Sequence, residues 1–148
     1  FGAKNLEKIK ESLQHSFRTI GVSSVLIFLF SISCGKYIIG LFTQDTFVYN
    51  IASDGIKLFS FGFLIIGINV FMSGYFTSIG NGSISALISV LRSLIFVTAA
   101  IVILPNFIGV AGIWLAVPIA ELLTVFFSIF FYFRNGRNIF GTLTLANA

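Results

Sequence analysis

The sequence predicts an all-α integral membrane protein built as a bundle of four spanning helices. A helix needs roughly 20 apolar residues to cross a hydrocarbon layer roughly 30 Å thick, at about 1.5 Å per residue. Four apolar stretches of about that length occur, at 17–40, 51–79, 84–104 and 110–133. Composition agrees, because 57% of the residues are hydrophobic, only 9% are charged and the mean hydropathy is +1.02, whereas an ordinary globular domain has about 25% charged residues. The connections are too short to hold a soluble domain.

The elements follow one another along the chain with short connections. We expect a cytoplasmic amphipathic segment at 1–16, a first span at 17–43, an outer turn and second span at 44–79, a cytoplasmic turn at 80–83, a third span at 84–104, an outer loop at 105–109, a fourth span at 110–133 and a cytoplasmic tail at 134–148. The first segment places apolar residues at spacings of three and four, which is typical of an amphipathic helix. Because Phe1 is not an initiator methionine, we expect the chain to begin inside a longer protein.

Local signals mark the ends of the spans. Thr43 or Asp45 can cap the second helix, because a side-chain oxygen there accepts a hydrogen bond from a free backbone N–H. The residues at 80–82 are Gly-Asn-Gly, which readily adopt positive φ and favour a tight cytoplasmic turn. Pro105 and Asn106 predict the end of the third span. Pro118 lies inside the fourth span, where it removes a backbone donor; we expect a kink there and name it as a hinge candidate.

The basic residues gather on one side of the predicted membrane. With an even number of spans, one face receives the larger group and the other receives Lys36 and Lys57, which are accompanied by Asp45 and Asp54. The larger group is Lys4, Lys8, Lys10, Arg18, Arg134 and Arg137. The positive-inside rule therefore predicts that both termini are cytoplasmic, and we expect a multi-pass protein of the plasma (inner) membrane. No basic run with interleaved aromatic residues remains to bind nucleic acid.

Two ionisable residues fall inside the spans, Arg92 in the third and Glu121 in the fourth. Each costs about 2.5 to 3.5 kcal/mol at the bilayer centre, so neither is expected to face lipid. Counted from the cytoplasmic ends of their helices, their depths are roughly 12 Å and roughly 18 Å, a difference that an arginine side chain can cover. We expect an ion pair or a shared polar network. It is either a static pair that fixes helix packing, or a protonatable or cation-binding Glu121 with Arg92 as its counter-charge.

Other residues offer weaker signals. Asn69 and Met72 lie three apart in the second span, and an amide with a soft thioether suits an adaptable binding surface. We therefore name both as substrate or coupling-ion candidates. Cys34 is the only cysteine, which excludes an internal disulfide and a cysteine metal cluster. No catalytic or phosphate-binding motif occurs, so we expect no enzyme activity, no cofactor and no metal site.

Four motifs together resemble the multidrug and toxic compound extrusion family. They are Phe-Gly-Ala-Lys-Asn at 1–5, Gly-Leu-Phe-Thr-Gln-Asp at 40–45, Ser-Ile-Gly-Asn-Gly at 78–82 and Gly-Ile-Trp-Leu-Ala-Val-Pro-Ile-Ala-Glu at 112–121. The resemblance implies a twelve-helix transporter of two six-helix lobes around a central cavity, with this chain as helices nine to twelve. It also implies export of organic cations and drugs in exchange for Na+ or H+ by alternating access. The chain alone is then expected to be inactive.

The resemblance also implies the partners and has one departure. The expected partners are the lipid bilayer, an organic cation or drug, and the remaining helices of the transporter. Some sodium-coupled members carry a carboxylate in the tenth helix, whereas the corresponding span here has no acid deeper than Asp54, so the coupling ion stays open. Two alternatives remain: a lipid-linked oligosaccharide flippase, for which Arg92 is the one basic residue at membrane depth, and a structural membrane protein without transport.

Overall fold

Four membrane-length helices make up the computed structural model, which describes residues 6–78 and 80–136. The stretches long and apolar enough to cross a membrane are Gln14–Phe42, Thr46–Ser78, Gly82–Ile108 and Val110–Arg134. The all-α prediction with four spans is confirmed. Residues 1–5, Ile79 and residues 137–148 lie outside the described residues. The predicted end of the second span at Ile79, the start of the amphipathic segment and most of the predicted tail therefore have no structural counterpart here.

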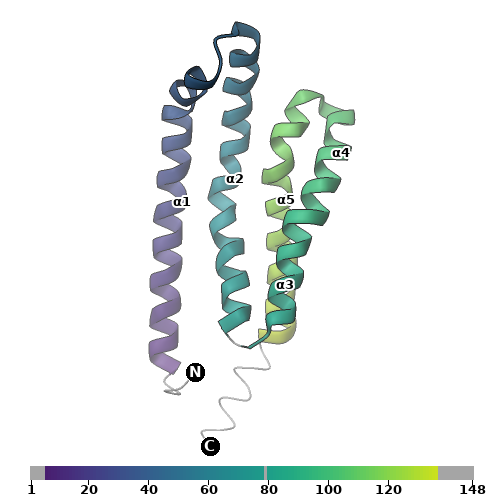
Figure 1. Cartoon of the computed structure of the whole chain (residues 1–148). Coiled ribbons are helices and arrows are strands. Elements are labelled where there is room, and N and C mark those ends of the chain that lie inside the picture. Colours follow the sequence, from purple (N-terminus) through teal and green to yellow (C-terminus); the bar gives the residue numbers. More distant parts are fainter. Residues whose placement is uncertain (1–5, 79, 137–148) are drawn as a thin grey trace, which may run out of the picture.

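The helices run alternately up and down, as Figure 1 shows. The first two spans are single helices, α1 (Leu6–Phe42) and α2 (Thr46–Ser78). The third is composite, with α3 (Gly82–Val90), a π-helical segment η1 (Leu91–Phe96) and α4 (Val97–Ile108). The fourth is α5 (Val110–Phe131), followed by a second π-helical segment, η2 (Tyr132–Gly136).

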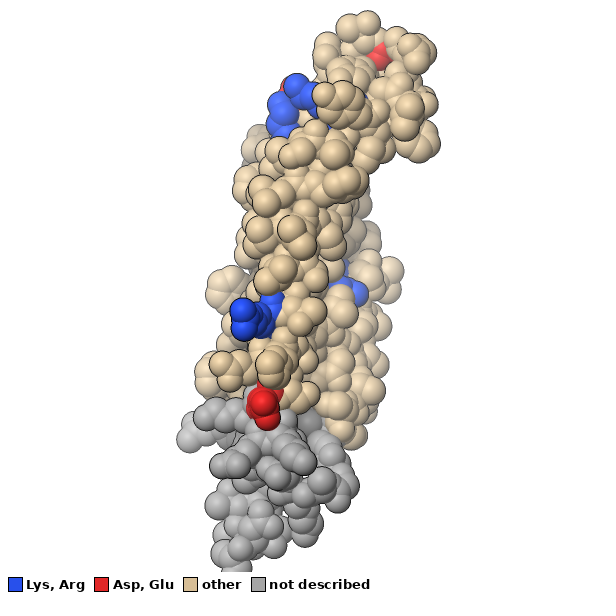
Figure 2. Space-filling model, turned by 90° about the vertical axis from the view of Figure 1, so that its left-hand side faces the viewer, with Lys and Arg blue, Asp and Glu red and all other residues tan. Residues whose placement is uncertain are grey.

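Helix α1 is longer than a bilayer requires. Its 37 residues extend about 55 Å at about 1.5 Å per residue, against roughly 30 Å of hydrocarbon. The described part of the amphipathic segment and the first span therefore form one continuous helix. Seen from the α1 side, a band without charged residues separates the charges near the α1–α2 turn from those lower on the same face (Figure 2). Such a band is what a helix facing hydrocarbon presents.

Asp45 caps α2. Its Oδ1 accepts hydrogen bonds from the backbone N–H groups of Phe47 at 2.8 Å and Val48 at 3.1 Å. These are two of the N–H groups that the first turn of a helix leaves without partners. The Thr43 hydroxyl oxygen instead accepts from the backbone N–H of Asp45 at 3.2 Å, so it supports the turn before the cap. Of the two residues proposed for this role, Asp45 fills it.

The predicted end of the third span at Leu104, and with it the outer loop at 105–109, is wrong. Helix α4 continues through Pro105 to Ile108. Proline lacks only one backbone donor, and near a helix end that loss is tolerated; next to it, the side-chain amide of Asn106 donates to the Val102 carbonyl at 2.8 Å. The helix stops at Gly109, whose φ of 62° and ψ of −145° lie in a region that is essentially restricted to glycine. The turn into α5 is this single residue.

Helix α2 is the centre of the bundle. It packs against α1, α3 and α5, whereas α1 contacts no other described helix. A small apolar core lies between α2 and α3 and consists of Met72, Phe76, Ile84 and Ile88. Most other large apolar side chains are exposed, which suits lipid or further helices as their surroundings.

Candidate functional site

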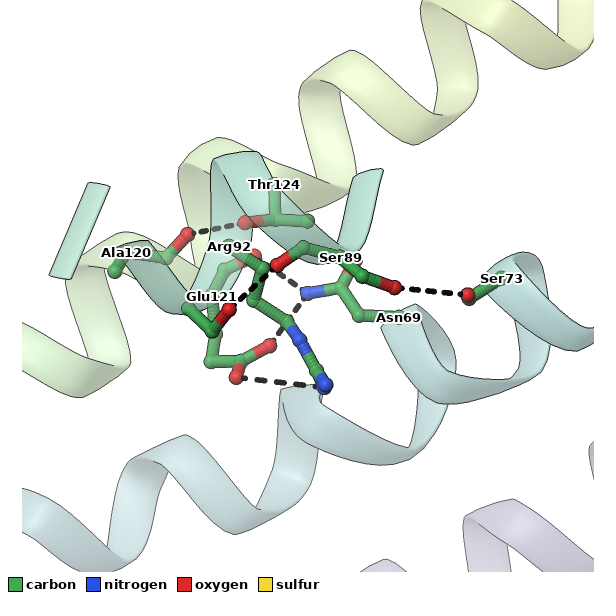
Figure 3. Close-up of polar contacts among 8 residues, drawn as sticks. Asn69, Ser73, Ser89, Arg92, Ala120, Glu121 and Thr124 are labelled. Carbon is green, nitrogen blue, oxygen red and sulfur yellow. Dashed lines mark hydrogen bonds and ion pairs between the residues drawn. The ribbon is translucent and has the colours of Figure 1, made fainter. Parts of the chain in front are cut away.

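A buried polar cluster lies where α2, η1 and α5 meet (Figure 3). Helix α2 supplies Asn69, which is 1% exposed, and α5 supplies Glu121, which is 5% exposed. The Asn69 Nδ2 atom donates to Glu121 Oε2 at 2.6 Å and to the Glu121 backbone carbonyl at 2.9 Å. One amide therefore holds both the side chain and the backbone of the acid. A hydrogen bond to a charged acceptor is stronger than one between neutral groups.

Arg92 approaches the same carboxylate from η1. Its Nη1 lies 3.9 Å from Glu121 Oε1, and its side chain is 27% exposed while that of Glu121 is 7% exposed. The carboxylate is thus shared, with Oε2 on the amide and Oε1 facing the guanidinium. Arg92 and Glu121, which were predicted to pair because they lie at similar depths in their helices, are therefore neighbours. Their separation is too long for a direct hydrogen bond. Their opposite charges offset one another inside the membrane.

One oxygen in this cluster is unpaired. Asn69 Oδ1 is buried and has no hydrogen-bond partner among the described residues. It lies on the amide group that holds Glu121, so the cluster contains an amide oxygen and a carboxylate as acceptors. Oxygen atoms of this kind bind protons or hard cations. The described residues contain no group of three or more His, Cys, Asp or Glu side chains suited to hold a metal ion.

Hydroxyl groups surround the cluster on the α3 side and along α5. The Ser73 hydroxyl lies 2.8 Å from that of Ser85 and 3.2 Å from that of Ser89, and Thr77 donates to Ser85 at 2.8 Å. On α5, Thr124 donates to the Ala120 carbonyl at 2.7 Å. Interhelical bonds between such small polar side chains help to hold membrane helices together. The bonds of Ser73 and Thr77 to Ser85 and Ser89 join α2 to α3, the helix that continues into η1.

The π-helical segment η1 was not predicted from the sequence. Arg92 is its second residue. Single π-helical turns inside α-helices occur frequently at functional sites, and their wider turn changes the direction of the side chains that follow. Residues 91–96 are apolar except for Arg92 and Ser93 and contain no glycine or proline. The sequence therefore gives no sign of an irregular helix at this point.

The remaining predicted site residues lie elsewhere. Met72 belongs to the apolar core between α2 and α3, and its role as a substrate or coupling-ion candidate stays a prediction. Pro118 is buried within an α5 that continues on both sides of it, and it packs against the backbone at Gly62, where an added Cβ would lie 3.6 Å from Pro118 Cγ. Its role as a hinge stays a prediction.

The comparisons with known proteins agree with the membrane fold. The sequence profile of the MatE family matches residues 1–102. The multidrug export protein MepA of Staphylococcus aureus (strain bovine RF122 / ET3-1) is 24% identical to this chain over 119 residues, which cover 80% of the chain and 26% of MepA. The chain thus spans about a quarter of the length of that relative. No solved structure matches. Since the family match extends over well more than half of a chain with four membrane-length helices, this multi-pass membrane chain belongs to the MatE family.

Proposed function

We propose that this chain is part of a secondary active transporter that exports drugs or organic cations in exchange for Na+ or H+ by alternating access. It supplies helices nine to twelve, in the second lobe. The proposal is supported by membership of the MatE family and by a relative whose name is multidrug export protein. Family membership favours transport over catalysis. The partners are the lipid bilayer, an exported compound and the remaining helices of the transporter.

The observation that carries the proposal is the carboxylate of Glu121, buried between an amide and a guanidinium. An ionisable group inside a membrane span is expensive to maintain and is typically functional. Binding of a proton or Na+ at Glu121 removes the attraction that holds Arg92 near α5. Loss of this attraction changes the free energy of the conformation in which η1 lies against α5. The equilibrium between two conformations of the lobe then shifts.

This coupling works only if the ion binds the two conformations differently. The long distance between Arg92 and Glu121, 3.9 Å, supports such a difference, because a pair at that distance can tighten in one conformation and separate in the other. Asn69 Oδ1, which is buried without a partner among the described residues, supplies a further oxygen for the ion. Asn69 is therefore a positioning residue for Glu121 and a candidate ligand.

A purely structural role for the cluster has its own support. Asn69 binds the backbone carbonyl of Glu121 as well as its carboxylate, an arrangement that locks α2 to α5 without any need for titration. In this second proposal the chain belongs to a membrane protein without transport. A lipid-linked oligosaccharide flippase is less favoured, since the buried polar cluster offers a single basic side chain, Arg92, and a pyrophosphate requires several.

Ethidium efflux from cells distinguishes export from a structural role. The protein that carries this chain is expressed as wild type and as Glu121→Gln at matched membrane abundance. We expect export to fall by about tenfold or more, the range of a coupling free energy of about 1–3 kcal/mol. Abundance should hold, because glutamine keeps an oxygen that accepts the Asn69 hydrogen bond.

The matched control is Glu11→Gln, which removes an exposed acid of α1 and should leave export unchanged. Export that persists in Glu121→Gln at matched abundance assigns the acid to a structural role and contradicts the proposed coupling. A fall in abundance alone supports the structural alternative.

A further inference from the structure

An aromatic cavity of about 270 Å³ opens at one end of the bundle. Its lining comes from three elements: Phe17 of α1, Phe71, Met72 and Tyr75 of α2, and Tyr132 of η2. The rings form two close pairs, with centroids 4.3 Å apart for Phe17 and Phe71 and 5.7 Å apart for Tyr75 and Tyr132. Because α1 contacts neither α5 nor η2 among the described residues, the cavity is a gap between them with α2 as its floor.

The cavity lies at the end of the bundle where the first span begins and the fourth ends. Phe17 opens the first apolar stretch, and Tyr132 directly follows α5. Phe17 lies three residues inside the first membrane-length stretch, Gln14–Phe42, and Tyr132 lies two residues before the end of the fourth, Val110–Arg134. Aromatic rings that carry a hydroxyl are enriched at the level of lipid headgroups, where the ring contacts acyl chains and the hydroxyl contacts polar groups. The cavity therefore lies at the boundary between the hydrocarbon and the headgroups.

Two arginines lie next to the cavity lining in the chain. Arg18 follows Phe17, and Arg134 is two residues beyond Tyr132; both side chains are exposed. Neither forms an ion pair with an acid in the described part of the chain, where the ion pairs are Asp54–Lys57 and Arg92–Glu121 and the carboxylate of Glu11 lies 3.9 Å from His15. Basic side chains beside a membrane cavity are typical of sites for anionic lipid headgroups.

From this combination we propose that the cavity binds an acyl chain of an anionic phospholipid, with Arg18 and Arg134 contacting its phosphate. The lining is apolar except for the two tyrosine hydroxyls, as an acyl chain requires. An organic cation is disfavoured, because the positive charges of Arg18 and Arg134, which neighbour the lining residues in the chain, repel it. The proposal does not rest on the export function.

Photo-crosslinking in vesicles tests the proposal. The protein that carries this chain is reconstituted in phosphatidylcholine vesicles that contain a small amount of phosphatidylglycerol with a diazirine near the end of one acyl chain. After irradiation, labelled peptides are identified by mass spectrometry. We expect label around Phe17, around Phe71 to Tyr75 and around Tyr132, at several times the level given by phosphatidylcholine with the same diazirine chain. This comparison of two lipids uses the wild-type protein alone.

A charge-removing variant tests the two arginines. In the double variant Arg18→Gln with Arg134→Gln, labelling by phosphatidylglycerol should fall to the level of phosphatidylcholine. The control is Lys36→Gln with Lys57→Gln, which removes two exposed positive charges from the halves of α1 and α2 nearest the turn that joins these helices and should leave the labelling unchanged. Equal labelling by the two lipids in wild type, or labelling unaffected by loss of the arginines, overturns the proposal. Loss of the label when ethidium is added at micromolar concentration assigns the cavity to organic cations instead.

Discussion

Asn69 joins two spans through one side chain. Its amide nitrogen holds the carboxylate and the backbone carbonyl of Glu121, so it orients the acid and ties α2 to α5 at the same point. A buried acceptor that loses its donor incurs its full desolvation cost, which is larger for a charged group than for a neutral one. The stability of this contact therefore depends on the amide and not only on the charge of Arg92.

Replacement of Asn69 by alanine should destabilise the protein. We expect a loss of about 1–3 kcal/mol in the free energy of unfolding, the cost of a buried polar group left without its partner. Thermal unfolding of the purified protein in detergent measures it. Asn50→Ala on the same helix is the matched control, because Asn50 is exposed, and it should change little. Equal melting temperatures for the two variants would show that the Asn69 contact contributes nothing to stability.

Sequence reasoning located Arg92 and Glu121 but missed the role of Asn69 as their partner. Depth along a helix can be counted from the sequence, so two charges at similar depth could be paired. When a helix is apolar on most sides, the sequence does not show which neighbouring helix a given side chain faces. Asn69 and Met72 were grouped by their spacing of three, yet three residues at 3.6 per turn leave about 60° between them. That angle is enough to direct Asn69 to α5 and Met72 to the core with α3.

At the scale of elements, α2 and α5 approach one another closely at Gly55. A methyl group built on Gly55 would overlap the indole ring of Trp114, so the ring lies directly on the α2 backbone. Small residues permit this approach between membrane helices, where van der Waals packing drives association. The approach lies on the same helix pair that carries Asn69 and Glu121.

Gly55→Ala should therefore disturb the packing of α2 on α5. We expect destabilisation by about 1–3 kcal/mol, as for other overpacked cores, measured as a lower melting temperature. In Gly74→Ala, also on α2, a Cβ meets nothing within 4 Å, and that variant should be neutral or slightly stabilising because alanine favours helix. If Gly55→Ala melts like Gly74→Ala, the close contact with Trp114 is not formed.

The turn between α4 and α5 gives a second prediction about an element. Gly109 has a φ of 62° and a ψ of −145°, a conformation that costs other residues about 1–3 kcal/mol. We expect Gly109→Ala to lower stability by an amount in that range, detected by chemical denaturation in mixed micelles. Gly82→Ala serves for comparison, since φ is not positive at Gly82 and a Cβ added there meets nothing within 4 Å. A denaturation curve shared by both variants would argue against the strained turn.

The sequence predicted the number of helices better than their irregularities. Length and hydropathy are summed over about 20 residues, so the four spans were clear. The π-helical segments depend on single hydrogen bonds that such sums do not resolve. Pro105 was interpreted as a helix end because proline usually is one, but it removes a single donor and the helix continues to Gly109.

At the scale of the molecule, the polar cluster links three of the four spans, and α1 stands apart on the far side of α2. Neutralisation of Glu121 would therefore change the contacts of η1, α2 and α5 together, while α1 contacts only α2 among the described elements. The exposed apolar faces and the 26% coverage of MepA both agree with a larger helical assembly around this bundle.

The central claim is that Glu121 couples an ion gradient to export, and transport in proteoliposomes tests it most directly. Purified wild type and Glu121→Gln are reconstituted at equal protein per lipid, and ethidium movement is followed under an imposed pH gradient and, separately, an imposed Na+ gradient. We expect one gradient to drive ethidium against its concentration in wild type and neither gradient to do so in Glu121→Gln. Gradient-driven movement at the wild-type rate in Glu121→Gln would contradict the account.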